Sequence, residues 1–450
     1  MKHLNRDRAR VVFWGLLFGI LLPVQAAAHL GLESSSPAKG DTLRTSVSTI
    51  HLTFTQRIEL RFTSVMIVTA AGDTIRGALA AADTTGRAVE LTLPRPLLDG
   101  NYVVVWRAAG NDGHAVTGNF DFSVVGVTPA AVTTTPPEAG IPNGVPPMET
   151  SDVNQQPLAI ALRWLNFLVA LLLTGGVVVQ LLINRVSMRQ PSEYWMLVSQ
   201  SARKLAIAAA IVSLLLSFPR LALQVKSLSG PGVESGIIGA LLRETNWGRG
   251  WVLQLLGSAG YLLAMFAAAP GAIGAWSLAG AASVMVAFGL AFSGHAAGVE
   301  QMQIINIAND AIHVVAVSAW IGTLAYVVVV ALPVALRQRS YEELGALIRA
   351  FSPLALGVTA IAVITGSVSA LSHLGPLSDL WTTDYGRMLF LKLVGVTGVA
   401  LSGAYNWRRL KPRLGTEQAT GQLHRSAAAE TGLALLVLLA TAILVALPTP

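Results

Sequence analysis

Residues 158–184 read LAIALRWLNFLVALLLTGGVVVQLLIN, an apolar run long enough to cross a lipid bilayer. Composition agrees with this interpretation, because 53% of the 450 residues are hydrophobic and only 12% are charged, less charge than soluble globular proteins of this size carry. Similar runs follow along the chain. We therefore expect a polytopic membrane domain over 157–450, with about eight helices at 158–184, 203–224, 250–269, 273–292, 309–333, 352–373, 387–406 and 427–447.

Ahead of these spans, residues 29–127 show the two-residue alternation of β-strands. Five short runs alternate apolar with polar residues and are separated by turn sequences such as Asp99-Gly100-Asn101; they cover 48–54, 65–68, 89–93, 102–106 and 119–124. Residues 128–156 are rich in Pro, Thr and Gly, which indicates a linker. The predicted fold is an N-terminal all-β, Ig-like (cupredoxin-like Greek-key) sandwich followed by an all-α transmembrane bundle.

Residues 1–28 have the pattern of a secretory signal peptide. Four basic residues precede the apolar run 11–22, and small residues lead up to Ala28. The alternative is an uncleaved first membrane helix, but the run is shorter than the roughly 20 residues that a span needs. Cleavage after Ala28 would make His29 the mature N-terminus.

The distribution of Lys and Arg predicts the orientation in the membrane. An exported N-terminal domain makes the first helix run inward. The loops then expected inside hold the larger share of basic residues, including Arg185, Arg189, Arg203, Lys204, Arg337, Arg339, Arg349, Arg408, Arg409, Lys411, Arg413 and Arg425. This bias follows the positive-inside rule. We expect a multi-pass protein of the bacterial inner membrane, with its N-terminal domain and its C-terminus on the periplasmic side.

The absence of cysteine limits the chemistry. With no Cys in the chain, disulfides, thiolate metal sites and cysteine nucleophiles are excluded, so a metal must be held by His, Asp, Glu, Met or backbone groups. The net charge of +7 does not indicate nucleic acid as a partner, because much of the basic charge lies in loops between spans.

A mature N-terminal histidine can chelate a metal through its α-amine and its imidazole Nδ1. Nitrogen-rich tetragonal sites favour Cu(II). Asp112 and His114 flank Gly113 in the predicted loop between two strands, where a glycine turn can direct both side chains toward one point. The alternative is an ordinary Asp-Gly turn with His114 in solvent. With His29 beside it, we favour a copper site.

Residues 29–125 resemble the periplasmic copper-resistance protein family CopC. The resemblance rests on His29, Ser36-Pro37-Ala38, Leu52-Thr53-Phe54, the segment 98–107, Asp112-Gly113-His114 and the segment 118–124. It implies Cu(II) held by the amine and ring of His29 with His114, and with Asp112 close to or in the coordination sphere. Only Met66 lies in the domain, so the methionine-rich Cu(I) site of some members is not expected. His51 is expected to have a surface or packing role.

The membrane region contains three histidines, His295, His313 and His373, all in the predicted outer half. We interpret them as a copper path, in which Asp310 could accept a hydrogen bond from His313 on the same helix. The region resembles the copper-resistance membrane family CopD at Arg163-Trp164-Leu165, 245–248, Ser293-Gly294-His295, His313 with 319–322, 383–387 with Lys392, and Asn406. The whole chain thus resembles CopC–CopD fusions associated with copper uptake.

The expected function is copper binding and transport, not enzyme catalysis. The soluble domain would capture Cu(II), and the membrane domain would move copper across the inner membrane, in the direction of import, for copper homeostasis or resistance. The expected partners are copper ions, the lipid bilayer and periplasmic copper donors. Three alternatives stay open: a haem-binding or copper-reducing electron-transfer protein, a copper monooxygenase, and a structural sandwich without metal.

Overall fold

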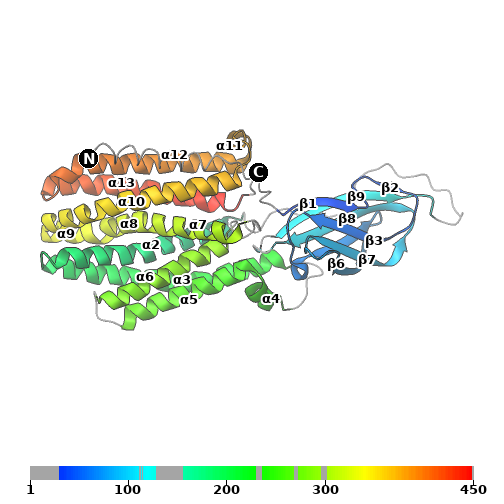
Figure 1. Ribbon diagram of the computed structural model, residues 1–450, viewed down its shortest axis with the longest axis horizontal. Helices are drawn as coiled ribbons and strands as arrows, with labels where there is room; N and C mark the ends of the chain where they lie inside the picture. The colour runs from blue at the N-terminus through cyan, green and yellow to red at the C-terminus, as the bar shows by residue number, and fades with distance from the viewer. Residues whose placement is uncertain are drawn as a thin grey trace, which may run out of the picture.

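A β-sandwich and a bundle of long helices lie end to end, as Figure 1 shows. The computed structural model describes residues 30–110, 113, 115–127, 156–229, 236–267, 272–294 and 302–447. The predicted signal peptide and nearly all of the predicted linker lie outside the described residues. The predicted order of a sandwich followed by a helical bundle is confirmed.

The sandwich consists of two sheets. The first has the strand order β1 (Leu32–Ser36), β3 (Val47–Phe54), β7 (Ala88–Leu97) and β6 (Ala78–Ala81). The second has the order β2 (Thr42–Leu43), β9 (Ala115–Val124), β8 (Gly100–Ala109), β4 (Ser64–Thr69) and β5 (Thr74–Ile75). Neighbouring strands are antiparallel except β2 and β9, which are parallel. Each of the five predicted runs lies within a strand.

Strand β3 shows how the alternating sequence builds the core. Ile50, Leu52 and Phe54 point inward and are fully buried, whereas Ser48 before them and His51 between them are exposed. Phe54 meets Trp106 of the other sheet edge to face, with ring centroids 5.3 Å apart. A Cβ at Gly118 on β9 would overlap the Trp106 ring, so this position needs glycine.

The membrane domain follows the sandwich as long helices that run alternately away from it and toward it (Figure 1). The first four are α2 (Pro157–Ser187), α3 (Glu193–Leu228), α5 (Asn246–Ala267) and α6 (Ile273–Phe292), with the short α4 (Ile237–Glu244) after α3. The later spans are α10 (Tyr341–His373), α12 (Asp384–Tyr405) and α13 (Glu417–Leu444), with the short α11 (Asp379–Thr382) before α12.

The fifth span is one continuous helix with two π-helical segments. It comprises α7 (Gln303–Val317), η4 (Ser318–Gly322), α8 (Thr323–Tyr326), η5 (Val327–Ala331) and α9 (Leu332–Gln338). A third π-helical segment, η6 (Asn406–Leu410), and the 3-10 turn η7 (Lys411–Arg413) extend α12. Among the described residues, eight helical spans are long and apolar enough to cross a membrane, which confirms the predicted number.

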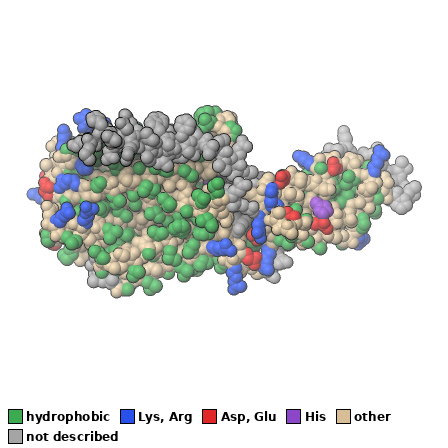
Figure 2. All heavy atoms as spheres, viewed as in Figure 1, with side chains coloured by type: hydrophobic (Ala, Val, Ile, Leu, Met, Phe, Trp, Pro, Cys, Tyr) green, Lys and Arg blue, Asp and Glu red, His purple; other side chains and the backbone are tan. Residues whose placement is uncertain are grey.

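Small residues let the helices approach closely. A Cβ at Gly175 on α2 would overlap the backbone of Gly322 in η4, and a Cβ at Gly250 on α5 would lie 2.5 Å from the carbonyl oxygen of Gly289 on α6. Close helix contacts of this kind are typical of membrane bundles, where packing rather than water exclusion holds helices together. On the face of the bundle that Figure 2 shows, many exposed side chains are apolar, and charged side chains lie mainly at its ends.

The two ends of the bundle differ in charge. We call the end that meets the sandwich the proximal end and the opposite end the distal end (Figure 1). The distal end holds basic residues expected in the inner loops: Arg185, Arg189, Arg337, Arg339, Arg349, Arg408, Arg409, Lys411, Arg413 and Arg425. The alternation of spans therefore gathers the charges as the sequence predicts.

Candidate metal centre

The three predicted Cu(II) ligands, His29, Asp112 and His114, lie outside the described residues. Their described neighbours place both chain segments at the proximal end of the sandwich. The backbone N–H of Gly31 donates to Thr55 Oγ1 at 2.9 Å, just beyond the end of β3. Ile58 pairs with Gly110, at the end of the hairpin that contains Asp112 and His114. Gly31 and Gly110, which are described and lie two residues from the predicted ligands His29 and Asp112 in the sequence, are thus at the same end of the sandwich.

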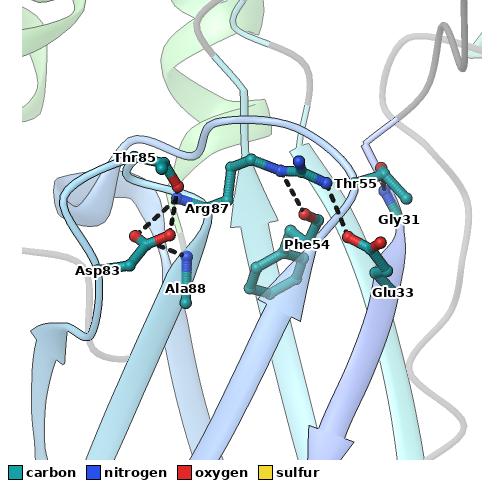
Figure 3. Close-up of polar contacts among 8 residues, drawn as sticks. All are labelled: Gly31, Glu33, Phe54, Thr55, Asp83, Thr85, Arg87 and Ala88. Carbon is teal, nitrogen blue, oxygen red and sulfur yellow. Dashed lines mark hydrogen bonds and ion pairs between the residues drawn. The ribbon is translucent and has the colours of Figure 1, made fainter.

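A network of polar contacts stabilises this end of the sandwich (Figure 3). The Arg87 guanidinium donates to the Phe54 carbonyl oxygen at 3.0 Å and to the Glu33 carboxylate at 2.7 Å. Asp83 accepts from Thr85 and from the backbone N–H of Arg87 at 3.1 Å. The hydrogen bond from Thr85 lowers the pKa of Asp83. These contacts join β1, β3 and the turn before β7, and they hold the start of β1 against the other two elements.

Gly113, which lies between two of the predicted copper ligands in the sequence, contacts the membrane domain directly. Its carbonyl oxygen accepts a hydrogen bond from Gln224 Nε2 of α3 at 2.5 Å, and its own N–H donates to Gly110 at 2.9 Å. Its φ of +78° lies in the left-handed region that favours glycine. A Cβ would lie 3.0 Å from both Gln224 Nε2 and Trp247 Cβ. Both the turn and the contact with the bundle therefore need Gly at this position.

An apolar cluster surrounds this contact and forms the docking surface. It joins two sandwich residues to helices α3, α4 and α5, and consists of Phe62, Ala109, Leu228, Ala240, Leu241, Trp247 and Trp251. All seven side chains are buried. Thr245 caps α5 by accepting from the N–H of Gly248 at 3.0 Å, which fixes the first turn that carries Trp247.

Polar contacts lie around the docking surface. Arg107 Nη1 on β8 donates to the carbonyl oxygen of Ser229 at 2.7 Å, and burial lowers the pKa of Arg107. Burial raises the pKa of Glu59, against the opposing effect of Arg57. Because ionised Glu59 is disfavoured here, ionisation weakens this surface as the pH rises through the raised pKa. The exposed pair of Arg61 and Glu244, 3.6 Å apart, adds little.

A row of polar side chains continues from the docking surface into the bundle. Arg220, one helical turn from Gln224 on α3, lies over the Trp247 ring with its guanidinium carbon 5.9 Å from the centroid. Arg220 also donates to Gln254 on α5, which in turn contacts the buried Asn166 on α2. We did not single out these residues from the sequence, although polar residues within apolar spans are a signal for them.

A second polar cluster joins α7 and α10 in the proximal half. Asn309 Nδ2 donates to Ser369 Oγ at 2.9 Å, and Ser369 donates to Asp310 Oδ1 at 2.7 Å. His313 Nδ1 lies 3.0 Å from both the Ala362 carbonyl oxygen and Thr365 Oγ1. We call these residues, together with His373, the proximal cluster.

The proximal cluster differs from the expected arrangement in the partners of Asp310 and His313, which were expected to contact each other. Asp310 is oriented by Ser369 on α10, and His313 Nδ1 by Ala362 and Thr365, so the neighbouring helix supplies partners that we expected within α7. His373 Nδ1 lies 2.7 Å from the Ser369 carbonyl oxygen, and Lys392 on α12 interacts electrostatically with Asp310.

The structure describes two of the three histidines of the predicted copper path, His313 and His373. His295 lies outside the described residues, and Ser369 connects His373 to the group around Asp310. Within the part of the chain that the structure describes, no three His, Asp or Glu side chains converge to hold a metal. Binding of copper by His313 and His373 thus stays a prediction.

Comparisons with known proteins give matches over most of the chain. The CopC domain family matches residues 32–125, the family "Copper resistance protein D-like, N-terminal domain" matches 151–303, and the family "Copper resistance protein D" matches 345–444. The Copper transport protein CutJ of Bacillus subtilis (strain 168) is 25% identical over 472 residues, which cover 99% of this chain and 79% of CutJ.

Two further matches concern the sandwich alone. Copper resistance protein C of Pseudomonas syringae pv. tomato is 32% identical over 112 residues, which cover 24% of this chain and 88% of that protein. The crystal structure of CopC from Methylosinus trichosporium OB3b is 29% identical, covers 21% of this chain and 93% of that chain, and has a TM-score of 0.21.

Proposed function

The chain belongs to the copper-resistance families as a fusion of CopC with CopD, and from this premise we propose that it captures Cu(II) in the sandwich and imports copper through the bundle. In this proposal His29, Asp112 and His114 hold the Cu(II), and the sandwich faces the periplasm. The protein is a transporter in copper homeostasis rather than an enzyme, and periplasmic copper donors are its upstream partners.

The docking of the Gly113 loop carries this proposal. Gln224 and Trp247 hold the loop between two predicted copper ligands against the proximal end of the bundle. A donor fixed beside the acceptor raises the effective concentration of copper there without any free diffusion. The basic residues at the distal end support a cytoplasmic location for that end. With this orientation, the inward membrane potential favours movement of a cation from the sandwich toward the distal end, which is import.

The proximal cluster is the group in the bundle best suited to receive a cation. Asp310 supplies a half-buried carboxylate, and His313 and His373 supply imidazole nitrogens suited to copper. Ser369 connects Asp310 and His373, since its hydroxyl donates to Asp310 and its carbonyl oxygen contacts His373 Nδ1, whereas His313 contacts Ala362 and Thr365 of the same helix. We propose that copper passes from the docked loop to this cluster.

Direction is tested in cells. Under copper limitation, cells that lack this chain should accumulate less copper than cells that carry it, measured as total cell copper by mass spectrometry. Equal accumulation would exclude uptake. Higher accumulation in the cells that lack the chain would indicate export instead.

Replacing Asp310 by Asn should slow copper uptake at least about tenfold, because a carboxylate charge that would offset the cation is lost. The amide keeps an oxygen that can accept from Ser369, so the local structure should persist. The measurement is copper uptake into vesicles that contain the full chain. Asp384→Asn is the matched control, since Asp384 is an exposed carboxylate at the same end, paired with Arg387 at 3.3 Å. Equal uptake by both variants would remove Asp310 from the path.

A further inference from the structure

Glu430 is a buried acidic side chain in the distal half of the bundle, away from the docking surface and the proximal cluster. It lies on α13, one turn inside the predicted apolar span 427–447, and only 4% of the residue is exposed. Ionisable residues are costly inside a bilayer and are rarely found there without a role in ion or proton movement. The proposed copper path gives this residue no task.

Two polar side chains from α13 and η6 form a chain of hydrogen bonds that ends at Glu430. Ser426 Oγ donates to Asn406 Oδ1 at 2.5 Å, and Asn406 Nδ2 donates to Glu430 Oε2 at 3.0 Å. Gly403 faces the other carboxyl oxygen, because a Cβ there would lie 3.4 Å from Oε1. The carboxyl group is therefore held in place by neutral groups.

Among the residues that the structure describes, no positive charge is paired with Glu430. Arg408, Arg409, His424 and Arg425 are exposed at the distal end. The elements packed on α13 carry other ionisable groups, none of which hydrogen-bonds to the carboxyl: Arg163 and Arg185 on α2, Tyr326 on α8, Arg337 on α9, and Asp384, Tyr385, Arg387, Lys392 and Tyr405 on α12. An ionised Glu430 would be an unpaired buried charge.

The ligand that best suits this site is a proton. Glu430, Asn406 and Ser426 offer a metal only hard oxygen ligands. The amide nitrogen of Asn406 is already used, because it donates a hydrogen bond to Glu430. Copper prefers imidazole, thioether or thiolate ligands and needs several of them. A proton needs a single carboxylate oxygen, and it removes the cost of the buried charge.

Helix α12 connects this site to the proximal cluster. It carries Lys392, which interacts electrostatically with Asp310, and it continues to Asn406, 14 residues or roughly 21 Å further along a helix. Between them, Gly395 and Gly398 pack against side chains of α13, where a Cβ would clash. Asn406 also begins the π-helical segment η6, and such segments are frequent at functional sites. A shift of α12 along α13 would change both sites.

We propose that Glu430 is a proton-binding site whose proton is exchanged during copper transport. The carboxyl is protonated in the resting protein. When a copper cation reaches the distal half, the O–H bond breaks and the proton leaves to water at the distal face. After copper leaves, a proton from the same water re-forms the bond. The coupling to copper rests on the proposed function, whereas the binding of the proton does not.

Proton binding is tested by infrared spectroscopy of the full chain in vesicles at neutral pH. The difference spectrum between the wild type and Glu430→Gln should show the C=O band of a protonated carboxylic acid. Glu417→Gln makes the same change at an exposed position on the first turn of α13, and should remove no such band. Absence of the band from the Glu430 difference spectrum would overturn the proposal.

Coupling is tested by copper uptake into the same vesicles at several values of pH on the distal face. Wild-type uptake should slow as this pH falls, because protonated Glu430 cannot offset the cation. Glu430→Gln should be slower at least about tenfold at neutral pH and insensitive to the distal pH, as expected for a site that stays neutral. Glu430→Asp, which keeps a titratable carboxyl, should retain the pH dependence.

The outcomes separate the two proposals. If the wild type takes up no copper at any pH, the proposed function fails, and the infrared band alone decides whether Glu430 holds a proton. If the wild type takes up copper and Glu430→Gln has the same rate and the same pH dependence, coupling through Glu430 is overturned. Wild-type helical content in each variant, measured by circular dichroism of the full chain, checks that the bundle has folded.

Discussion

One extra residue ahead of His29 should lower the Cu(II) affinity of the sandwich at least about a hundredfold. The extension turns the α-amine of His29 into a peptide N–H and places the new amine one residue further from the site. The predicted site therefore loses its amine ligand. The imidazole of His29 and the other two predicted ligands remain. The measurement is calorimetric titration of residues 29–127 with Cu(II), with and without the additional residue.

The sandwich is suited to this test on its own. Its two sheets enclose a core that consists of sandwich residues alone. His51→Ala is the matched control, because His51 is exposed on β3 and lies 3.3 Å from Glu90. That variant should bind Cu(II) as the unchanged domain does.

Equal affinity with and without the extra residue would reject the amine as a ligand. His114→Ala and Asp112→Ala then separate the two remaining ligands: loss of His114 should weaken binding strongly, and loss of Asp112 less so if the carboxylate lies beside the copper rather than on it. Absence of any copper heat from the unchanged domain would instead support a structural sandwich without metal.

The parts of the fold that local sequence controls were predictable. The alternation in β3 follows from one side of the strand being buried, and the eight spans follow from the length of apolar runs. Both signals lie within a single element. Helix ends were less predictable: α3 extends over Glu193–Leu228, beyond the predicted 203–224, because polar residues can continue a helix outside the apolar region.

The docking surface could not be predicted, because it depends on residues far apart in the sequence. Gly113 and Gln224 are separated by 111 residues, and only the fold brings them together. The same holds for the proximal cluster, where α10 supplies the partners of Asp310 and His313. The spacing of Asp310 and His313 predicted a contact between them within α7, but spacing along one helix contains no information about the neighbouring helix, which supplies the partners of both.

Replacing Trp247 by Ala should separate copper capture from copper transport. Trp247 is 5% exposed, contacts the Gly113 loop and belongs to the apolar docking surface. Truncating a buried tryptophan costs about 3–5 kcal/mol, and part of that cost falls on the contact between sandwich and bundle. We expect uptake into vesicles to fall at least about tenfold, because an undocked donor loses its high effective concentration.

Capture itself should be unaffected, since Trp247 lies on α5 and not in the sandwich. Trp381→Ala is the matched control: Trp381 is 62% exposed on α11, at the same end of the bundle but outside the docking surface. Because the chain has no cysteine, Arg61→Cys with Glu244→Cys allows a short thiol cross-linker to report docking directly.

Cross-linking and uptake measured together decide whether copper transport requires the docked sandwich. The yield of cross-linked protein should fall with Trp247→Ala and not with Trp381→Ala, and uptake should fall in the same variant. Gln224→Ala removes only the hydrogen bond to Gly113, worth about 0.5–1.5 kcal/mol. Its cross-linking yield and its uptake rate should therefore lie between those of Trp247→Ala and Trp381→Ala. If Trp247→Ala prevents cross-linking and uptake continues at the wild-type rate, copper reaches the bundle without the docked loop, and the transfer that this contact implies does not take place.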